Sequence, residues 1–80
     1  MTPQEVLAQL DEIFRDVLDN PDIKLSEKTV ANDIEEWDSL NNIHLVIAIE
    51  KHFKVKFTSA EIQNWENVGA MCVAISKKLG

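Results

Sequence analysis

The chain has 80 residues, of which 45% are hydrophobic, and a net charge of −6, so we expect one small globular domain spanning residues 1–80. The negative charge disfavours nucleic acid as a partner, because phosphate binding needs a basic surface, and a core this small is a poor framework for an enzyme cleft. One cysteine excludes an intramolecular disulfide, and no apolar run is long enough to span a membrane. We therefore expect a soluble, cytoplasmic monomer without membrane insertion.

The first predicted element is an amphipathic helix. Thr2-Pro3-Gln4-Glu5 forms a capping box with proline at the first helical position. Apolar residues follow at helical spacing and give one buried face: Val6, Leu7, Leu10, Ile13, Phe14, Val17 and Leu18. Asp19-Asn20-Pro21 ends the helix.

A long loop is expected from Asp22 to Asp38. Its apolar residues recur too sparsely for a helix and are expected to pin the loop onto the core: Ile23, Leu25, Val30, Ile34 and Trp37. The loop belongs to an acidic half of the chain, since Met1 to Asp38 contains 11 acidic and 3 basic residues.

A second helix is predicted from Ser39 to Phe53. Its apolar residues spread over more than half of the circumference, which predicts a helix buried on most sides: Leu40, Ile43, Val46, Ile47, Ile49 and Phe53. One narrow, nearly neutral polar strip remains, formed by Asn41, His44, Ala48 and Lys51.

Two shorter helices are predicted after it. Thr58 to Glu61 is a second capping box and opens a short helix that ends at about Asn64. Asn67 caps the last helix, in which Cys72 is a core residue, and Trp65, like Trp37, serves as an anchor. The prediction is an all-α four-helix bundle, with three main helices, one short helix and a long loop between the first two.

The chemical signals are few. Ser39 at a helix start is most simply a helix cap. As a nucleophile it would need a base, but His44 lies about 140° round the helix and no nucleophile elbow is present. His44 and His52 lack a third ligand for zinc, so both are expected to be solvated. Chemistry alone leaves a helical protein with no catalytic or metal site.

Resemblance changes the interpretation of Ser39. Asp38-Ser39-Leu40, within Glu36-Trp37-Asp38-Ser39-Leu40 and followed by the apolar run from Ile43 to Ile49, resembles the acyl carrier protein family. The likeness extends over the whole chain, including the Asn67-Val68-Gly69 start of the last helix.

The resemblance implies a covalent substrate carrier rather than an enzyme. A phosphopantetheinyl transferase would attach 4′-phosphopantetheine from coenzyme A to Ser39, with Asp38 and Leu40 flanking the attachment point. The arm would carry acyl groups as thioesters to acyl-transferring, ketosynthase or ligase enzymes of fatty acid, polyketide or related biosynthesis. Leu40 and Ile43 are candidate acyl-chain contacts, and the strip formed by Asn41, His44, Ala48 and Lys51 is the candidate docking surface.

The sequence departs from carriers of primary fatty acid synthesis, which usually have acids at the places of Asn41 and His44. We therefore expect a specialised, free-standing carrier of a dedicated pathway. Two alternatives remain at this stage. One is an aminoacyl or peptidyl carrier, and the other is a small helical interaction module in which Ser39 is only a cap.

Overall fold

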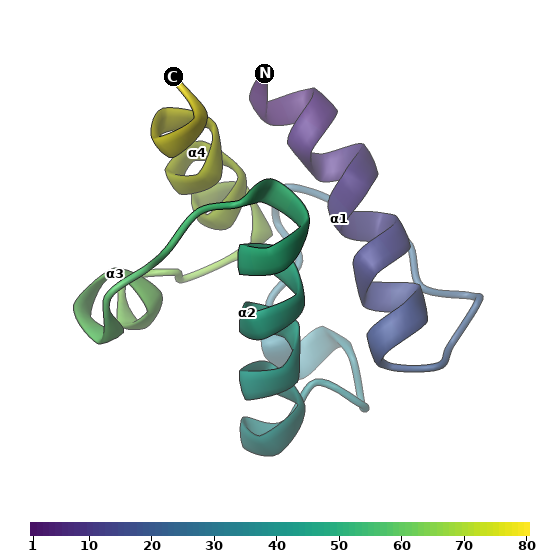
Figure 1. The fold of residues 1–80 in the computed structure, drawn as a ribbon. Coiled ribbons are helices and arrows are strands. Elements are labelled where there is room, and N and C mark those ends of the chain that lie inside the picture. Colours follow the sequence, from purple (N-terminus) through teal and green to yellow (C-terminus); the bar gives the residue numbers. More distant parts are fainter.

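Four α-helices and one short 3-10 turn make up the structure, a computed structural model that describes residues 1–80 (Figure 1). The long helices are α1 (Pro3–Val17), α2 (Ser39–Phe53) and α4 (Val68–Leu79), and the short helix α3 (Ser59–Gln63) precedes α4. A 3-10 turn, η1 (Ala31–Asp33), interrupts the long loop and was not predicted. The all-α architecture and the long connection between α1 and α2 are confirmed.

Local capping interactions explain where the helices begin. The Thr2 hydroxyl accepts the Glu5 N–H, while the Glu5 carboxylate accepts the Thr2 N–H, and Thr58 and Glu61 repeat this reciprocal pair at α3. These hydrogen bonds lower the pKa of both glutamates. The Asn67 side chain accepts the Ala70 N–H at the start of α4.

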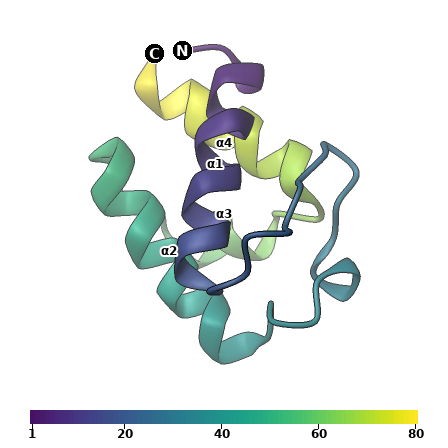
Figure 2. The same ribbon diagram turned by 90° about the vertical axis from the view of Figure 1, so that its right-hand side faces the viewer.

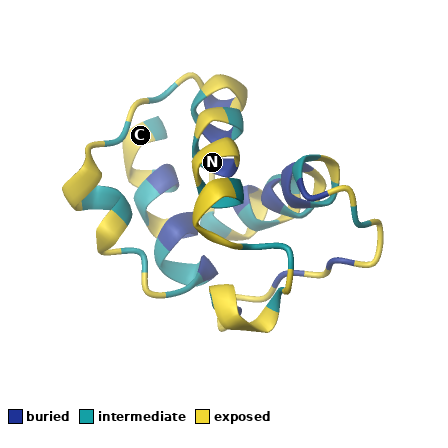
Figure 3. Cartoon of the chain, turned by 90° about the horizontal axis from the view of Figure 1, so that it is seen from below, coloured by how far each residue is buried: buried dark blue, intermediate teal, exposed yellow.

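The core lies between α1, α2 and α4, since α1 packs against both of the other long helices (Figure 2). Buried positions follow the helix sides that face the middle of the molecule (Figure 3). Fourteen apolar residues form one cluster: Val6, Leu10, Ile13, Phe14, Leu18, Ile23, Leu25, Leu45, Ile49, Phe53, Val68, Met71, Cys72 and Ile75. The predicted core face of the first helix and the predicted core position of Cys72 in the last helix are therefore confirmed.

The predicted burial of α2 is confirmed for Ile49 and Phe53 and was wrong for three other residues. Its core side consists of Leu45, Ile49 and Phe53, and Leu45 was absent from the predicted face. Because α1 and the other elements cover only one side of this helix, three of the aliphatic residues assigned to the core point outward: Leu40, Ile43 and Ile47. No other helix crosses in front of α2 in Figure 1.

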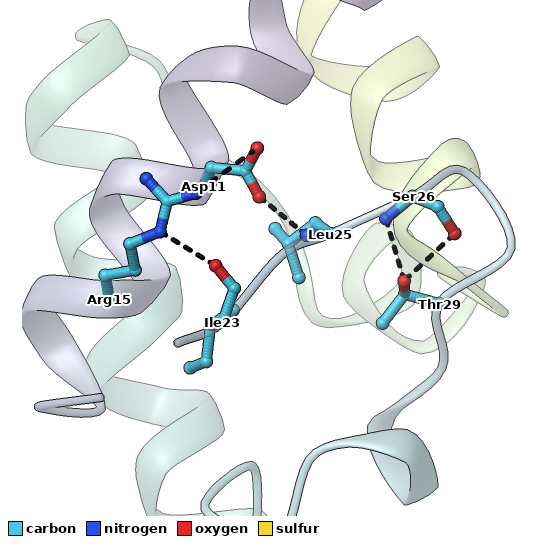
Figure 4. Close-up of polar contacts among 6 residues, drawn as sticks. All are labelled: Asp11, Arg15, Ile23, Leu25, Ser26 and Thr29. Atoms are coloured by element: carbon cyan, nitrogen blue, oxygen red, sulfur yellow. Dashed lines mark hydrogen bonds and ion pairs between the residues drawn. The ribbon is translucent and has the colours of Figure 1, made fainter. Parts of the chain in front are cut away.

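The long loop is fastened to α1 and to the start of α4. Arg15 Nε donates to the Ile23 carbonyl at 2.8 Å, and the Asp11 carboxylate accepts the Leu25 N–H at 2.6 Å (Figure 4). Thr29 is buried, and its hydroxyl accepts the Ser26 N–H (Figure 4). The predicted pinning of the loop by Ile23 and Leu25 is confirmed, and polar contacts complete it.

Gly69 allows the loop to approach α4 closely. The N–H groups of Val68 and Gly69 donate to the carbonyls of Thr29 and Glu27 at 2.9 and 2.8 Å, so the loop supplies acceptors to the first turn of α4. A Cβ at Gly69 would lie 2.8 Å from the Glu27 carbonyl oxygen, which is a backbone atom and cannot swing away.

We expect Gly69→Ala to destabilise the fold, although alanine is the better helix former. The helical gain of about 1 kcal/mol is outweighed by a shift of the loop that costs roughly 1–3 kcal/mol. Urea unfolding measures the net change, and amide exchange at Gly69 reports the loss of its bond to Glu27. A variant more stable than the wild type would contradict the steric account.

No helix is both long enough and apolar enough to cross a bilayer.

Candidate functional site: the start of α2

Ser39 is the first residue of α2 and its side chain is exposed. The helix cap is the residue before it: the Asp38 carboxylate accepts the Asn41 N–H at 2.8 Å. The interpretation of Ser39 as the cap was therefore wrong. Asp is as good a cap as Ser, so the sequence alone offered two adjacent candidates. Capping by Asp38 leaves the Ser39 hydroxyl without an intramolecular hydrogen bond.

Two backbone donors in the first turn of α2 are free. The N–H groups of Ser39 and Leu40 have no acceptor in the protein, because they belong to the first turn of α2. Such donors, together with the helix macrodipole, favour an anion at a helix N-terminus. The residues around Ser39 therefore fit a phosphodiester on its oxygen.

The segment that leads into Ser39 is held in place from two sides. Asn41 Nδ2 donates to the Glu36 carbonyl at 2.7 Å, and Asn42 Oδ1 accepts the Trp37 indole N–H at 2.9 Å. The Trp37 ring also meets Phe14 of the core edge to face, with 4.9 Å between ring centroids. These contacts fix the chain immediately before the serine, and confirm Trp37 as an anchor.

A cleft of about 410 Å³ opens beside Ser39, between the start of α2, α3 and α4. Its volume is within the range of small-molecule sites. Apolar and polar side chains share the lining: Ala31, Trp37, Asp38, Ser39, Asn42, Ile62, Trp65, Glu66, Asn67 and Met71. Sequence reasoning missed this cleft because Ile62, Trp65 and Met71 come from elements far along the chain.

Only two of the four residues in the predicted docking strip are exposed. His44 and Lys51 are exposed, whereas Asn41 is half-buried and uses its amide to fasten the Glu36 carbonyl. Ala48 is also half-buried and packs against the core cluster.

The outward side of α2 is dominated by aliphatic side chains instead. Leu40, Ile43 and Ile47 are 65%, 58% and 45% exposed. The expectation of a narrow polar strip was therefore wrong. The side of α2 that faces the core contains Leu45 and Ile49, which leaves the aliphatic residues on the opposite side exposed.

Two histidines were expected to be solvated, and both are exposed. His44 lies on the outward side of α2, while the His52 Nε2 atom lies 2.6 Å from the Gln9 Oε1 atom of α1. No group of three or more His, Cys, Asp or Glu side chains is arranged to hold a metal ion.

The sequence matches a family model described as "Phosphopantetheine attachment site" over residues 8–75. The chain belongs to the acyl carrier protein family. It is 30% identical to an acyl carrier protein of Phenylobacterium zucineum, with 95% of this chain and 96% of the relative covered. It is 26% identical to an acyl carrier protein homolog of Mycoplasma genitalium, with 99% and 94% covered.

A solved structure supports the same assignment. The solution structure of the holo acyl carrier protein of Geobacter metallireducens superimposes with a TM-score of 0.87 at 44% sequence identity, and covers 91% of this chain and 84% of that chain. The protein is thus an acyl carrier, a covalent carrier rather than a catalyst, which bears 4′-phosphopantetheine and interacts with a phosphopantetheinyl transferase and with biosynthetic enzymes.

The carrier contains one thiol of its own, Cys72, which is buried in α4. Burial, with smaller effects from the charges of Glu27 and Asp11, raises the pKa of the Cys72 thiol to about 11. The thiolate is the reactive form, so Cys72 is protected both by its pKa and by its position.

We expect iodoacetamide at about pH 8 to leave Cys72 of the folded apo-carrier unmodified, and to alkylate it fully in denaturant. Intact mass after timed quenching measures both rates. Because the folded pKa is raised, the protonated thiol stabilises the fold below the unfolded pKa, and that contribution is lost as pH rises towards 11. Rapid alkylation of the folded apo-carrier would show that α4 opens locally.

Proposed function

We propose that the Ser39 hydroxyl is the attachment point of the phosphopantetheine arm. The observation that carries this proposal is the exposed hydroxyl at the first helical position, free of hydrogen bonds and next to two free backbone N–H groups. The arm supplies a terminal thiol that holds acyl groups as thioesters. The chain's own contribution is to present the Ser39 oxygen to the transferase and to stabilise the resulting phosphodiester anion through the N–H groups of α2.

Asp38 and Leu40 have different roles in this proposal. Asp38 fixes the first turn of α2 through its bond to the Asn41 N–H, and so leaves the Ser39 oxygen free. Leu40 is exposed next to the attachment point, where a partner enzyme can cover it. Ile43, one turn further along the same side of α2, extends this apolar contact.

The cleft beside Ser39 offers room for the part of the arm nearest the protein. Trp37, Ile62 and Trp65 supply apolar walls, while Asn42 and Asn67 supply amide groups that can pair with the amides of the arm. Leu40 and Ile43 do not line this cleft. We therefore assign them to contacts with an acyl chain or a partner outside the bundle.

We also propose a dedicated pathway rather than primary fatty acid synthesis. The exposed polar residues on the outward side of α2 are His44 and Lys51, and neither is acidic. An enzyme with a basic docking surface gains no attraction from these two side chains. Acyl-transferring, ketosynthase or ligase enzymes of one pathway are the proposed partners.

Incubation with coenzyme A and a broad-specificity phosphopantetheinyl transferase tests the attachment. Intact mass should increase by one arm, and fragmentation should place it on Ser39. A protein that gains no mass, or gains it on another residue, would refute the assignment.

A further inference from the structure

The outward side of α2 changes character along its length. It begins at Ser39 with acidic neighbours, continues with the exposed side chains of Leu40, Ile43 and Ile47, and ends in a group of lysines. Over 12 residues of helix, Ser39 and Lys51 are separated by about 18 Å. The two ends of this surface can therefore meet different parts of one partner.

The lysine end is a defined hollow. A depression of about 460 Å³ at the C-terminal end of α2 is lined by the following residues: Ile47, Glu50, Lys51, Lys54, Val55 and Lys56. The three lysines are exposed and form no ion pair. The one acid, Glu50, already accepts the Phe57 N–H at 2.9 Å. The hollow is thus a basic site on a protein whose net charge is −6.

We propose that α2 docks onto an acyl-transferring enzyme whose surface has an aliphatic centre and a carboxylate rim, with that rim meeting Lys51, Lys54 and Lys56. The proposed partner surface depends on the proposed role of Ser39. An enzyme that acts on the group carried by the arm must approach the Ser39 end of α2, and the rest of its surface then lies along the helix towards the lysines. The aliphatic side chains would bury apolar surface against the partner, and the lysines would orient the carrier on the partner and discriminate between partner enzymes.

Charge complementarity argues against a membrane as the occupant. An anionic bilayer would attract the lysines but would repel Glu35, Glu36 and Asp38, which precede Ser39. A protein surface can carry both signs, basic near the serine and acidic about 18 Å away. The two-signed surface of the carrier therefore favours a protein partner.

A charge-swap experiment tests the proposal. The probe is a ketosynthase of primary fatty acid synthesis with a basic docking surface, together with a version in which two basic residues are changed to glutamate where that surface meets the C-terminal end of α2. Affinities for the Ser39→Ala carrier are measured by biolayer interferometry at several salt concentrations. Because binding is read without an arm, failure of attachment at Ser39 and failure of this docking surface are separate results.

We expect the glutamate-bearing enzyme to bind the carrier roughly tenfold more tightly than the original enzyme does, and this difference to shrink with salt. The carrier Lys51→Glu/Lys56→Glu should reverse the preference. The matched control Lys24→Glu/Lys28→Glu makes the same change in net charge within the long loop, and should leave the order of the two enzymes unchanged. Ile47→Ser should weaken binding of both enzymes by a factor that does not depend on salt.

Three results would overturn the proposal. The first is an unchanged order of affinities in Lys51→Glu/Lys56→Glu, and the second is a reversal by the loop control, which would reduce the effect to net charge. The third is an alternative partner for the lysine hollow. If the wild type binds phosphatidylglycerol vesicles and Lys51→Glu/Lys56→Glu abolishes that binding, the hollow belongs to a membrane contact. If the wild type self-associates in sedimentation and the same variant does not, the hollow belongs to a contact with a second copy of this chain.

Discussion

Ser39→Ala should abolish attachment of the arm while leaving the fold and its stability nearly unchanged. The Ser39 hydroxyl makes no hydrogen bond within the protein, and its removal leaves the Asp38 cap intact. A surface substitution of this kind changes the free energy of unfolding by about 0.5 kcal/mol or less. Intact mass after incubation with transferase and coenzyme A should show no gain, and urea unfolding should match that of the wild type.

Asp38→Ala is the matched control, and it should lower stability while leaving attachment of the arm intact. Removing the capping carboxylate should cost about 0.5–2 kcal/mol, because the Asn41 N–H loses its acceptor. The Ser39 hydroxyl remains, so loading should still go to completion. Asp38→Asn keeps a capping oxygen, and should recover most of the lost stability.

The pair of variants separates two roles that adjacent residues could share. If Ser39→Ala unfolds the protein, the missing arm could not be attributed to the missing hydroxyl. If Ser39→Ala costs more stability than Asp38→Ala, the cap has been assigned to the wrong residue. Loading of Ser39→Ala at the wild-type level would refute the attachment site itself.

Phe14→Ala should remove most of the stability of the fold. Phe14 is the largest fully buried side chain of the 14-residue core and meets the Trp37 ring edge to face, with 4.9 Å between ring centroids. Truncation of a buried phenylalanine costs about 3–5 kcal/mol, and an 80-residue domain has only roughly 4–12 kcal/mol in total. Thermal and urea unfolding measure the loss.

Phe14 also links the core to the functional site, since Trp37 lies two residues before Ser39. We expect the indole N–H of Trp37, which donates to Asn42, to exchange faster in Phe14→Ala than in the wild type. Phe57→Ala is the control: Phe57 forms a similar ring pair with Trp65 but is only half-buried, so its loss should cost roughly 1 kcal/mol. Equal losses in the two variants would contradict the larger contribution expected of the fully buried Phe14.

Sequence by itself determined the local features of this protein. The capping boxes at Thr2 and Thr58 fixed the starts of α1 and α3, because the signal lies within four consecutive residues. The apolar spacing from Val6 to Leu18 fixed the buried side of α1 for the same reason. The Asp38-Ser39-Leu40 step, in its helical context, pointed to the family that the comparisons show.

Only the tertiary structure decided which sides of α2 are buried and what surrounds Ser39. A helix that is aliphatic on most sides has no sequence signal for its core direction, so Leu45 was missed while Leu40, Ile43 and Ile47 were assigned to the interior. Which side of α2 is buried depends on where α1 packs against it. Likewise, Asn41 appeared to be a surface residue until the fold brought the Glu36 carbonyl to its amide. The cleft beside Ser39 joins residues as distant as Ala31 and Met71, and such long-range contacts exist only once the helices have packed.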